Sequence, residues 1–336
     1  MSDRGSTDWG ISARAAALHR ASLVWDDHGG FAFSTASALD GIMRWRASGI
    51  DYLSINVGYD VTPWTLAVEA LSRYRHWVQA HDGAVVQVTR VEDVHRAKRE
   101  GKLAVSFDLE GMDALNGDLG MVDVYYRLGV RQMLFAYNRN NVAGGGCHDD
   151  DGGLTPFGRE VIREMNRVGM VVDGSHCGHR TTMEAMEASA SPVIFSHSNA
   201  RRLCDHERNI RDDQIRACAA AGGVVGVTGV GRFLGPKGPV IEHLVEHIDY
   251  MVQLVGPEHV GLGMDSVLEA KPPGQPFRGS RTYWPDAQYP DSGSGYIEPE
   301  AFPHLTQALL DRGYDEAHVR GILGENFLRV ARCVWK

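Results

Sequence analysis

Several features are scarce in this sequence of 336 residues. Its five cysteines are odd in number and lack CxxC spacing, which argues against a disulfide framework and against a thiolate zinc site. No stretch approaches the roughly 18 uninterrupted apolar residues of a membrane span. The 34 basic residues are outnumbered by 43 acidic ones, and the formal net charge of -9 offers no attraction to phosphate backbones. We therefore expect neither a nucleic-acid partner nor membrane insertion.

The first 22 residues carry several charged side chains and lack the apolar core that a secretory signal peptide requires. Together with cysteines that we expect to be reduced, this favours a cytoplasmic protein. The composition is 43% hydrophobic and 23% charged, which is typical of a globular chain with a sizeable core.

A short apolar run that ends in a polar or glycine-rich cluster, followed by a helical pattern, recurs eight times. The runs are 21–25, 52–55, 103–107, 132–136, 169–172, 192–195, 223–227 and 259–263. Their nearly continuous apolar character is typical of strands buried on both faces of a parallel sheet. Amphipathic stretches lie between them, among them 159–168, 181–189 and 241–255. The alternation predicts an α/β fold, a closed (β/α)8 barrel of TIM type, with residues 1–336 as one domain.

A doubly wound open sheet is the alternative fold. However, no GxGxxG motif follows the first run, and five strand ends carry ionisable groups. In a barrel all of these ends meet on one face, which favours the barrel.

Residues 268–298 break the alternation, because this segment is rich in proline, glycine and serine and contains four aromatic residues without a sustained period. A loop of this length is usually functional or disordered. Since it follows the eighth strand, we expect it over the barrel mouth, as a lid or as a plain surface insertion. Helices are expected over 301–312 and 316–323, with Gly324 as the C-cap of the second.

Ionisable residues at the strand ends supply the candidate chemistry. His28, Glu110, His176 and His197 end strands one, three, five and six, and Asp265 ends strand eight. Imidazole and carboxylate are ligands that suit Zn²⁺, which lowers the pKa of a bound water and polarises a carbonyl group. Asp265, if it is not itself a ligand, is the group expected to move the proton. The set therefore indicates a metal-dependent hydrolase that cleaves an amide bond.

The sequence resembles the zinc dipeptidases related to renal or membrane dipeptidase, peptidase family M19, along nearly its whole length. The motifs that carry the resemblance are Asp26-Asp27-His28, Leu109-Glu110-Gly111, GLTPFG at 153–158, DGSHC at 173–177, FSHSNA at 195–200, Arg208-Asn209, GLGMD at 261–265 and GENFLRV at 324–330. Their order and spacing make the resemblance highly specific.

The resemblance implies a two-zinc centre in an amidohydrolase-like barrel. It assigns Glu110 as the bridging ligand, His176 and His197 as ligands of one ion and His28 as a ligand of the other. It also implies that Asp265 is the catalytic proton carrier and that Arg208 holds the carboxylate of a small dipeptide-like substrate. Relatives are often dimers, so a homodimer is the assembly that the resemblance implies.

Two positions depart from the family pattern. The family has a His-x-Asp motif after the first strand, whereas this chain has Gly30 at the Asp position, so one metal site loses an anionic ligand and the number of zinc ions, one or two, is open. The family also places a substrate-contacting histidine where this chain has Tyr137. A phenol donates a hydrogen bond but brings no positive charge at neutral pH. Tyr137 is therefore a candidate substrate-binding residue that lacks the charge a protonated histidine would bring.

These departures leave two alternatives beside a dipeptidase. The first is a specialised relative that acts on a modified amide or a pathway intermediate, selected by Tyr137 and the aromatic loop. The second is a metal-binding or ligand-binding protein with little hydrolytic turnover, which the loss of a ligand at Gly30 suggests.

Overall fold

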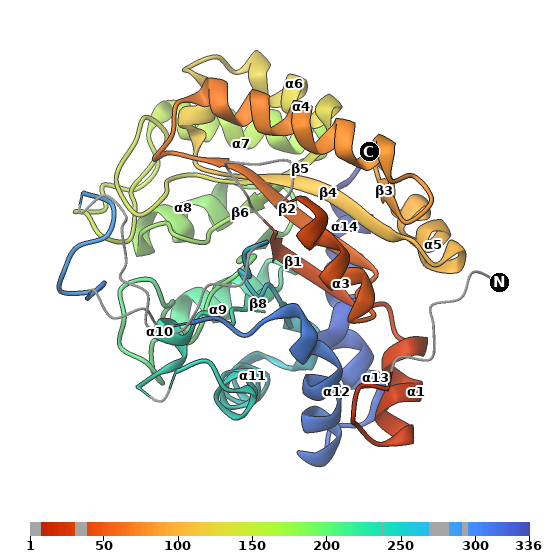
Figure 1. Cartoon of the computed structure of the whole chain (residues 1–336). Helices are drawn as coiled ribbons and strands as arrows, with labels where there is room; N and C mark the ends of the chain where they lie inside the picture. Colours follow the sequence, from red (N-terminus) through yellow and green to blue (C-terminus); the bar gives the residue numbers. More distant parts are fainter. Residues whose placement is uncertain (1–7, 31–38, 237, 269–281, 291–294) are drawn as a thin grey trace.

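Parallel strands at the centre of the molecule are surrounded by helices (Figure 1). The computed structural model describes residues 8–30, 39–236, 238–268, 282–290 and 295–336. Its strands are β1 Trp25–Gly29, β2 Tyr52–Tyr59, β3 Val85–Gln87, β4 Leu103–Glu110, β5 Val130–Leu134, β6 Val171–Asp173, β7 Val193–Ile194, β8 Val225–Val227 and β9 Val260–Leu262.

The sheet closes on itself. Strands β1, β2, β4, β5, β6 and β7 pair in that order, β8 pairs with β9, and every pairing is parallel. Two single bridges join the parts: Phe195 pairs with Val225, and Gly29 pairs with Ser266. The amide N of Gly30 donates to the carbonyl O of Ser266 at 2.7 Å across the second junction. The predicted (β/α)8 barrel is therefore confirmed.

The eight predicted strands correspond to the eight barrel strands, and two details were wrong. The first strand was expected at 21–25 but spans Trp25–Gly29. The prediction missed most of it because Asp26, Asp27 and His28 are polar residues that are nevertheless buried, and a search for apolar runs does not detect them. Strand β3 was not predicted. It has three residues and pairs only with the beginning of β4, outside the closed ring.

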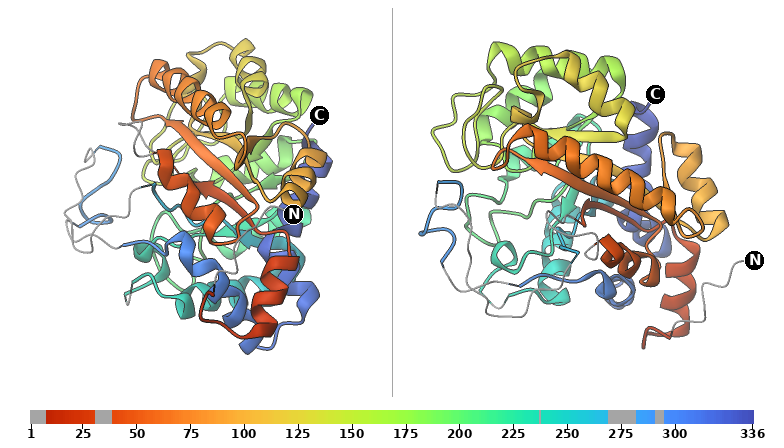
Figure 2. Two further views of the ribbon diagram at one scale, coloured as in Figure 1. Left: turned by 45° about the vertical axis from the view of Figure 1, so that its right-hand side comes forward. Right: turned by 45° about the horizontal axis from the view of Figure 1, so that its top comes forward.

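The helices lie on the outer side of the strands, as the views in Figures 1 and 2 show. They are α1 Ala13–Ala21, α3 Met43–Ala47, α4 Trp64–Ala80, α5 Val91–Glu100, α6 Gly120–Leu128, α7 Pro156–Val168, α8 His179–Ala188, α9 Asp212–Ala220, α10 Gly231–Leu234, α11 Ile241–Val255, α12 Phe302–Asp311, α13 Glu316–Arg320 and α14 Asn326–Val334. Short helical turns are η1 Asp40–Ile42, η2 Met112–Leu115, η3 Pro257–His259, η4 Pro299–Ala301 and η5 Gly321–Glu325.

Helix ends follow local capping chemistry more closely than hydrophobic periodicity. Helix α7 begins three residues before the predicted start because the Thr155 hydroxyl caps the amide of Gly158 and Pro156 takes the first helical position. Gly324 does not end a helix, since the chain continues through η5 into α14. A Cβ there would lie 2.5 Å from the carbonyl O of Leu23, so the glycine permits close backbone approach.

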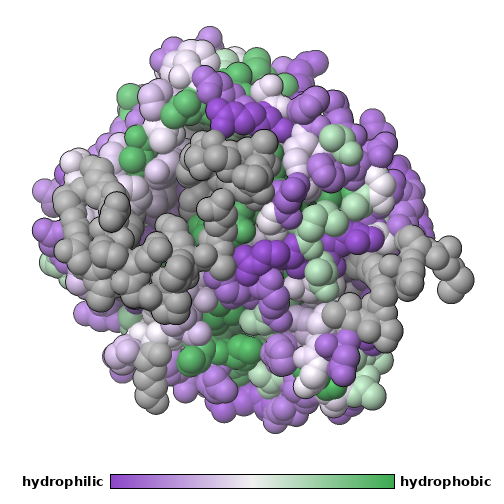
Figure 3. All heavy atoms as spheres, in the orientation of Figure 1, coloured by the Kyte–Doolittle hydropathy of each residue, from purple (hydrophilic) through white to green (hydrophobic). Residues whose placement is uncertain are grey.

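Apolar side chains fill the space between the strands and the surrounding helices, and Trp45, Phe107 and Ile248 are among the fully buried ones. The face seen in Figure 3 is mainly hydrophilic, with smaller hydrophobic areas between. Within the described part of the chain, no helix has the length and apolarity that crossing a bilayer requires.

The segment expected over the barrel mouth, 268–298, falls partly outside the described residues, which omit 269–281 and 291–294. Its described part contacts loops that follow the barrel strands. The carbonyl O of Tyr283 accepts from Asn138 Nδ2 at 3.0 Å, and the Tyr289 hydroxyl lies 3.1 Å from His148 Nε2.

Candidate metal centre

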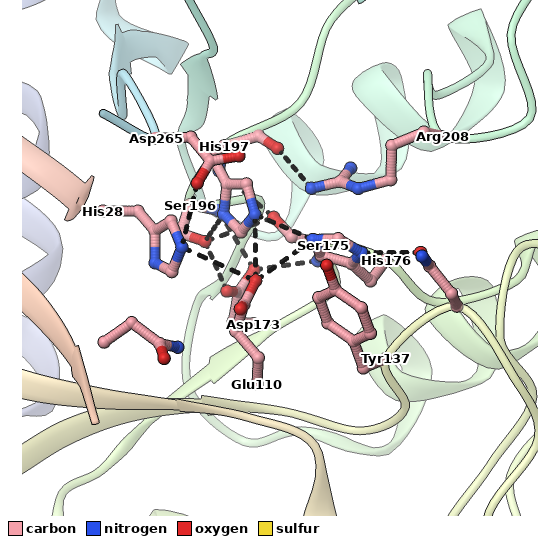
Figure 4. A network of polar contacts seen from close by, with 12 residues as sticks. His28, Glu110, Tyr137, Asp173, Ser175, His176, Ser196, His197, Arg208 and Asp265 are labelled. Carbon is pink, nitrogen blue, oxygen red and sulfur yellow. Dashed lines mark hydrogen bonds and ion pairs between the residues drawn. The ribbon is translucent and has the colours of Figure 1, made fainter. Parts of the chain in front are cut away.

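Three of the predicted ligand side chains meet at one point. The Nε2 atoms of His176 and His197 lie 3.0 Å apart, and Glu110 Oε1 lies 3.1 Å from the first and 3.2 Å from the second (Figure 4). Glu110 is the last residue of β4, and the two histidines follow β6 and β7. The barrel therefore brings together residues that lie up to 87 positions apart.

Hydrogen bonds on the far side of each imidazole place the ring proton on Nδ1, away from this gap. Asn138 donates through its Nδ2 to a carbonyl, so its Oδ1, 2.7 Å from His176 Nδ1, must accept the Nδ1 proton. The Ser196 hydroxyl donates to Asp173 at 2.5 Å and therefore accepts from His197 Nδ1 at 2.7 Å. Both Nε2 atoms thus carry lone pairs, and with Glu110 Oε1 they form a donor set that fits a cation.

The electrostatics agree with this donor set. Burial lowers the pKa of both His176 and His197 well below its usual value, with Arg208 and His28 adding to the effect. Burial also raises the pKa of Glu110 to about 8, although the nearby His28 opposes the shift. A carboxylate and two neutral imidazoles in such a site favour a bound divalent cation, which stabilises the ionised carboxylate.

His28 lies beside this set. Its ring stacks on that of His197, with 3.9 Å between the centroids and 7° between the planes, and its Nε2 is 3.5 Å from Glu110 Oε1. This buried Nε2 has no hydrogen-bond partner among the described residues. On the other side of the ring, Nδ1 is 3.2 Å from Asp108 Oδ1. His28, Glu110 and His197 offer ligand atoms that all lie within 4.8 Å of one another.

Gly30 supplies no ligand, and its backbone has a left-handed φ of 67°. The first atom that a Cβ would meet is Leu53 Cδ2 at 3.1 Å, followed by Ile55 and Leu268. The Cβ of any other residue at this position would therefore point toward apolar side chains.

Asp265 lies at the barrel mouth, next to His28 and His197 in Figure 4. Its Oδ1 is 3.6 Å from His28 Nε2, and its backbone N donates to the His28 carbonyl at 2.9 Å. The side chain is 17% exposed, so the carboxylate is accessible to solvent while it borders the donor set.

Arg208 is held from two sides. Its Nη1 donates to the Ser198 hydroxyl at 3.1 Å, and its Nη2 donates to the carbonyl O of His197 at 2.8 Å. The residue is 2% exposed, and its Nε is buried without a partner among the described residues. A guanidinium has five N–H donors, so one further N–H on each of Nη1 and Nη2 is left for a ligand.

Tyr137 packs against His176, one of the candidate ligands. Its ring stacks on His176 with 4.1 Å between centroids, and in Figure 4 its hydroxyl end points toward the donor set. The backbone N of Tyr137 donates to Asp60 Oδ2 at 3.0 Å, and Tyr59 and Trp284 contact the ring edge-on.

All seven sequence-predicted site residues therefore converge on one face of the barrel. Sequence reasoning missed the residues that orient them, above all Asp108 and Asn138. Asp108 accepts hydrogen bonds from Ser54 at 2.7 Å and from Asn56 at 3.0 Å, which aims its other contact at His28. It precedes Glu110 by two residues, and this period of two puts both carboxylates on the same face of β4, a signal that the sequence did contain.

A closed parallel barrel with this donor set at its mouth defines a (β/α)8 barrel of the metal-dependent hydrolase type. The family model for membrane dipeptidase, peptidase family M19, matches residues 40–272 and 289–336. The chain belongs to this family.

Named relatives agree with that placement. An uncharacterized dipeptidase of Schizosaccharomyces pombe is 33% identical over 291 residues, 82% of this chain and 64% of that protein. The dipeptidase tcpJ of Claviceps purpurea is 31% identical over 248 residues, 72% of this chain and 54% of that protein. The chain thus spans less than two thirds of the length of either relative.

Solved structures show the same fold. An amidohydrolase from Pseudomonas aeruginosa superposes with a TM-score of 0.84 at 29% identity, covering 96% of this chain and 99% of the other. A metallopeptidase from Rhodobacter sphaeroides, liganded with a phosphinate mimic of the dipeptide L-Ala-D-Ala, has a TM-score of 0.78 at 20% identity, covering 93% and 99%.

Proposed function

We propose that this chain is a zinc-dependent dipeptidase. The observation that carries the proposal is the close approach of His176 Nε2, His197 Nε2 and Glu110 Oε1, which lie 3.0–3.2 Å apart with both imidazole protons on the far side of the rings. Membership of the membrane dipeptidase family and the names of the relatives support the choice of reaction. Two nitrogens and a carboxylate oxygen are a donor set that catalytic zinc favours.

His176, His197 and Glu110 would hold the firmer ion, and His28 would serve a second, weaker one that shares Glu110. When bound, zinc supplies a water of lowered pKa and polarises the substrate carbonyl. Hydrogen bonds that the two histidines donate through Nδ1 to Asn138 and Ser196 hold them in the tautomer that leaves Nε2 free for the metal.

The remaining residues would act directly on the dipeptide. Asp265 would take the proton from the attacking water and deliver it to the leaving amine, a role supported by its place 3.6 Å from His28 Nε2. The unused N–H groups of Arg208 would hold the C-terminal carboxylate in a charge-assisted hydrogen bond. The Tyr137 hydroxyl would donate to the carbonyl oxygen as negative charge develops there.

We also propose that residues 1–336 form one barrel domain and that residues 282–290 cover part of its mouth. The contacts of Tyr283 with Asn138 and of Tyr289 with His148 support this cover. It would shield the reaction from bulk water on that side.

The test is a metal-replete assay of the purified chain against a panel of dipeptides, with zinc counted per chain. We expect hydrolysis that is lost on chelation and restored by zinc. A chain that binds zinc and cleaves none of the dipeptides contradicts the proposal and favours the metal-binding alternative.

A further inference from the structure

A buried residue, Asp60, links several loops at the barrel mouth. It directly follows β2 and is 9% exposed. Its backbone N donates to the carbonyl O of Glu110 at 3.1 Å, and its carbonyl O accepts from the Tyr283 hydroxyl at 3.2 Å. Asp60 thus joins the end of β2 to the proposed bridging ligand and to the segment at the barrel mouth.

The side chain of Asp60 accepts hydrogen bonds from three N–H groups of the described residues. Its Oδ2 accepts from the backbone N of Tyr137 at 3.0 Å and from Asn141 Nδ2 at 2.9 Å. Its Oδ1 accepts from the backbone N of Asp113 at 3.1 Å. Both oxygens therefore act as acceptors, which a carboxylate provides and an amide of the same shape does not.

The glycine after the proposed bridging ligand leaves room for this carboxylate. Gly111 has a φ of 127°, and a Cβ at this position would overlap Asp60 Oδ1. Any side chain at residue 111 would therefore displace the carboxylate as well as strain the backbone. The Glu110-Gly111 pair thus accommodates Asp60 in addition to supplying a candidate ligand.

The hydrogen bond from the backbone of Tyr137 connects Asp60 to the candidate site. The hydroxyl end of Tyr137 points toward the donor set in Figure 4. In the proposed reaction this hydroxyl donates to the carbonyl oxygen as negative charge develops there. A misplacement of about 1 Å in such a site can cost roughly 10²-fold in rate, so the backbone of Tyr137 must be held in place.

We propose that Asp60 is a positioning residue, which holds Tyr137 so that its hydroxyl meets the reacting carbonyl oxygen. The inference rests on the proposed dipeptidase function. It requires that the effect of Asp60 on the reaction pass through Tyr137. An effect through the backbone of Glu110 would instead change the zinc content, so the two routes can be separated.

The experiment is a double-mutant cycle with Asp60→Asn and Tyr137→Phe, measured on a dipeptide that the wild-type chain cleaves. Loss of one such donor typically costs about 10²–10³-fold in kcat, which we expect for Tyr137→Phe. Asp60→Asn should lower kcat about tenfold or more, with a smaller change in KM and with zinc retained. In the Tyr137→Phe background, Asp60→Asn should lower kcat by less than about twofold, because the two residues act as one unit.

The outcomes separate this inference from the proposed function. An unchanged kcat in Asp60→Asn, effects that multiply in the double variant, or a loss of zinc overturns the positioning role and leaves the dipeptidase function intact. A wild-type chain that cleaves no dipeptide overturns both.

Asp249→Asn is the matched control for stability. Asp249 lies on α11, is also 9% exposed, and accepts hydrogen bonds from Arg312 and Tyr314. We expect this variant to keep the wild-type kcat. A fall as large as that of Asp60→Asn would trace the effect to lost stability and overturn the positioning role.

Asn141→Asp disturbs the same carboxylate while Asp60 itself is kept. The variant retains the oxygen that accepts from the backbone N of Ala143 at 2.8 Å, but it replaces the amide N that donates to Asp60 Oδ2 with a second acceptor. We expect kcat to fall as in Asp60→Asn and the effect to vanish again in the Tyr137→Phe background. If Asp60→Asn does not fold, this variant decides, and a wild-type kcat in it overturns the positioning role.

Discussion

The Oδ1 atom of Asn138 lies 2.7 Å from Nδ1 of His176, and the Nδ2 atom of the same amide lies 3.0 Å from the carbonyl O of Tyr283. One fully buried side chain thus orients a proposed metal ligand and fastens the segment at the barrel mouth. Its backbone has a φ of 61°, a left-handed conformation that asparagine and glycine tolerate better than most residues.

Replacing that amide should weaken metal binding. Asn138→Gly suits the left-handed backbone but frees the His176 ring, so we expect zinc affinity to fall about 10–100-fold. Asn138→Asp keeps an acceptor for the Nδ1 proton and should stay near wild type. Competition with a chromophoric chelator measures both.

Asn116→Gly is the matched control, because Asn116 also has a positive φ, of 49°, but is exposed at the end of η2. Loss of zinc affinity in this variant as well would trace the effect to the backbone rather than to the contact with His176.

Asp265→Asn should separate proton transfer from metal binding. The amide keeps the size and tolerates the φ of 59° at this position, but it cannot carry a proton. We expect kcat to fall about 10²–10⁴-fold while the zinc content is retained. Turnover near the wild-type rate would exclude Asp265 as the proton carrier, and loss of zinc would make it a ligand.

Arg208→Gln should act mainly on binding. The carboxylate contact is present in both the ground state and the transition state, so KM should rise more than kcat falls. Dipeptides with an amidated C-terminus should be poor substrates of the wild-type enzyme and should lose little more with the variant. Because Arg208 also bonds the His197 carbonyl, zinc content is measured alongside. Amidated dipeptides cleaved as fast as free ones would favour the specialised-amide alternative.

Dialysis against a weak chelator should leave about one zinc per chain. The site of Glu110, His176 and His197 has three ligands, whereas the His28 site lacks the carboxylate that Gly30 cannot provide. Gly30→Asp is expected not to restore a second tight site, because its Cβ would start toward Leu53. Two equally tight ions in the wild-type chain would contradict this prediction, and metal analysis by mass spectrometry decides it.

The sequence allowed the barrel and the convergence of the candidate ligands to be predicted because both depend on local signals: an apolar run, then an ionisable group at its end. Strand β1 was misplaced because Asp26 and Asp27 are buried polar residues, which accept hydrogen bonds from the indole N–H groups of Trp45 and Trp25. A hydrogen-bond partner lowers the cost of burying a carboxylate, but a hydropathy pattern contains no information about such partners.

The positioning contacts were harder to predict. Asn138 and His176 are 38 residues apart, and the tautomer that the amide selects depends on where the Tyr283 carbonyl lies. Such features arise from tertiary packing, so no single motif encodes them.

The junction between β1 and β9 has a consequence for the timing of folding. His28 is made near the start of synthesis, and Asp265, whose backbone N bonds the His28 carbonyl, is made 237 residues later. At about 5–20 residues per second, roughly 12–47 s separate the two on the ribosome. During that interval the nascent chain acquires its other proposed ligands, His176 and His197 among them, but still lacks Asp265, the proposed proton carrier. If Asp265 carries the proton as proposed, hydrolysis begins only when the ring has closed, and we expect a chain interrupted before β9 to be inactive.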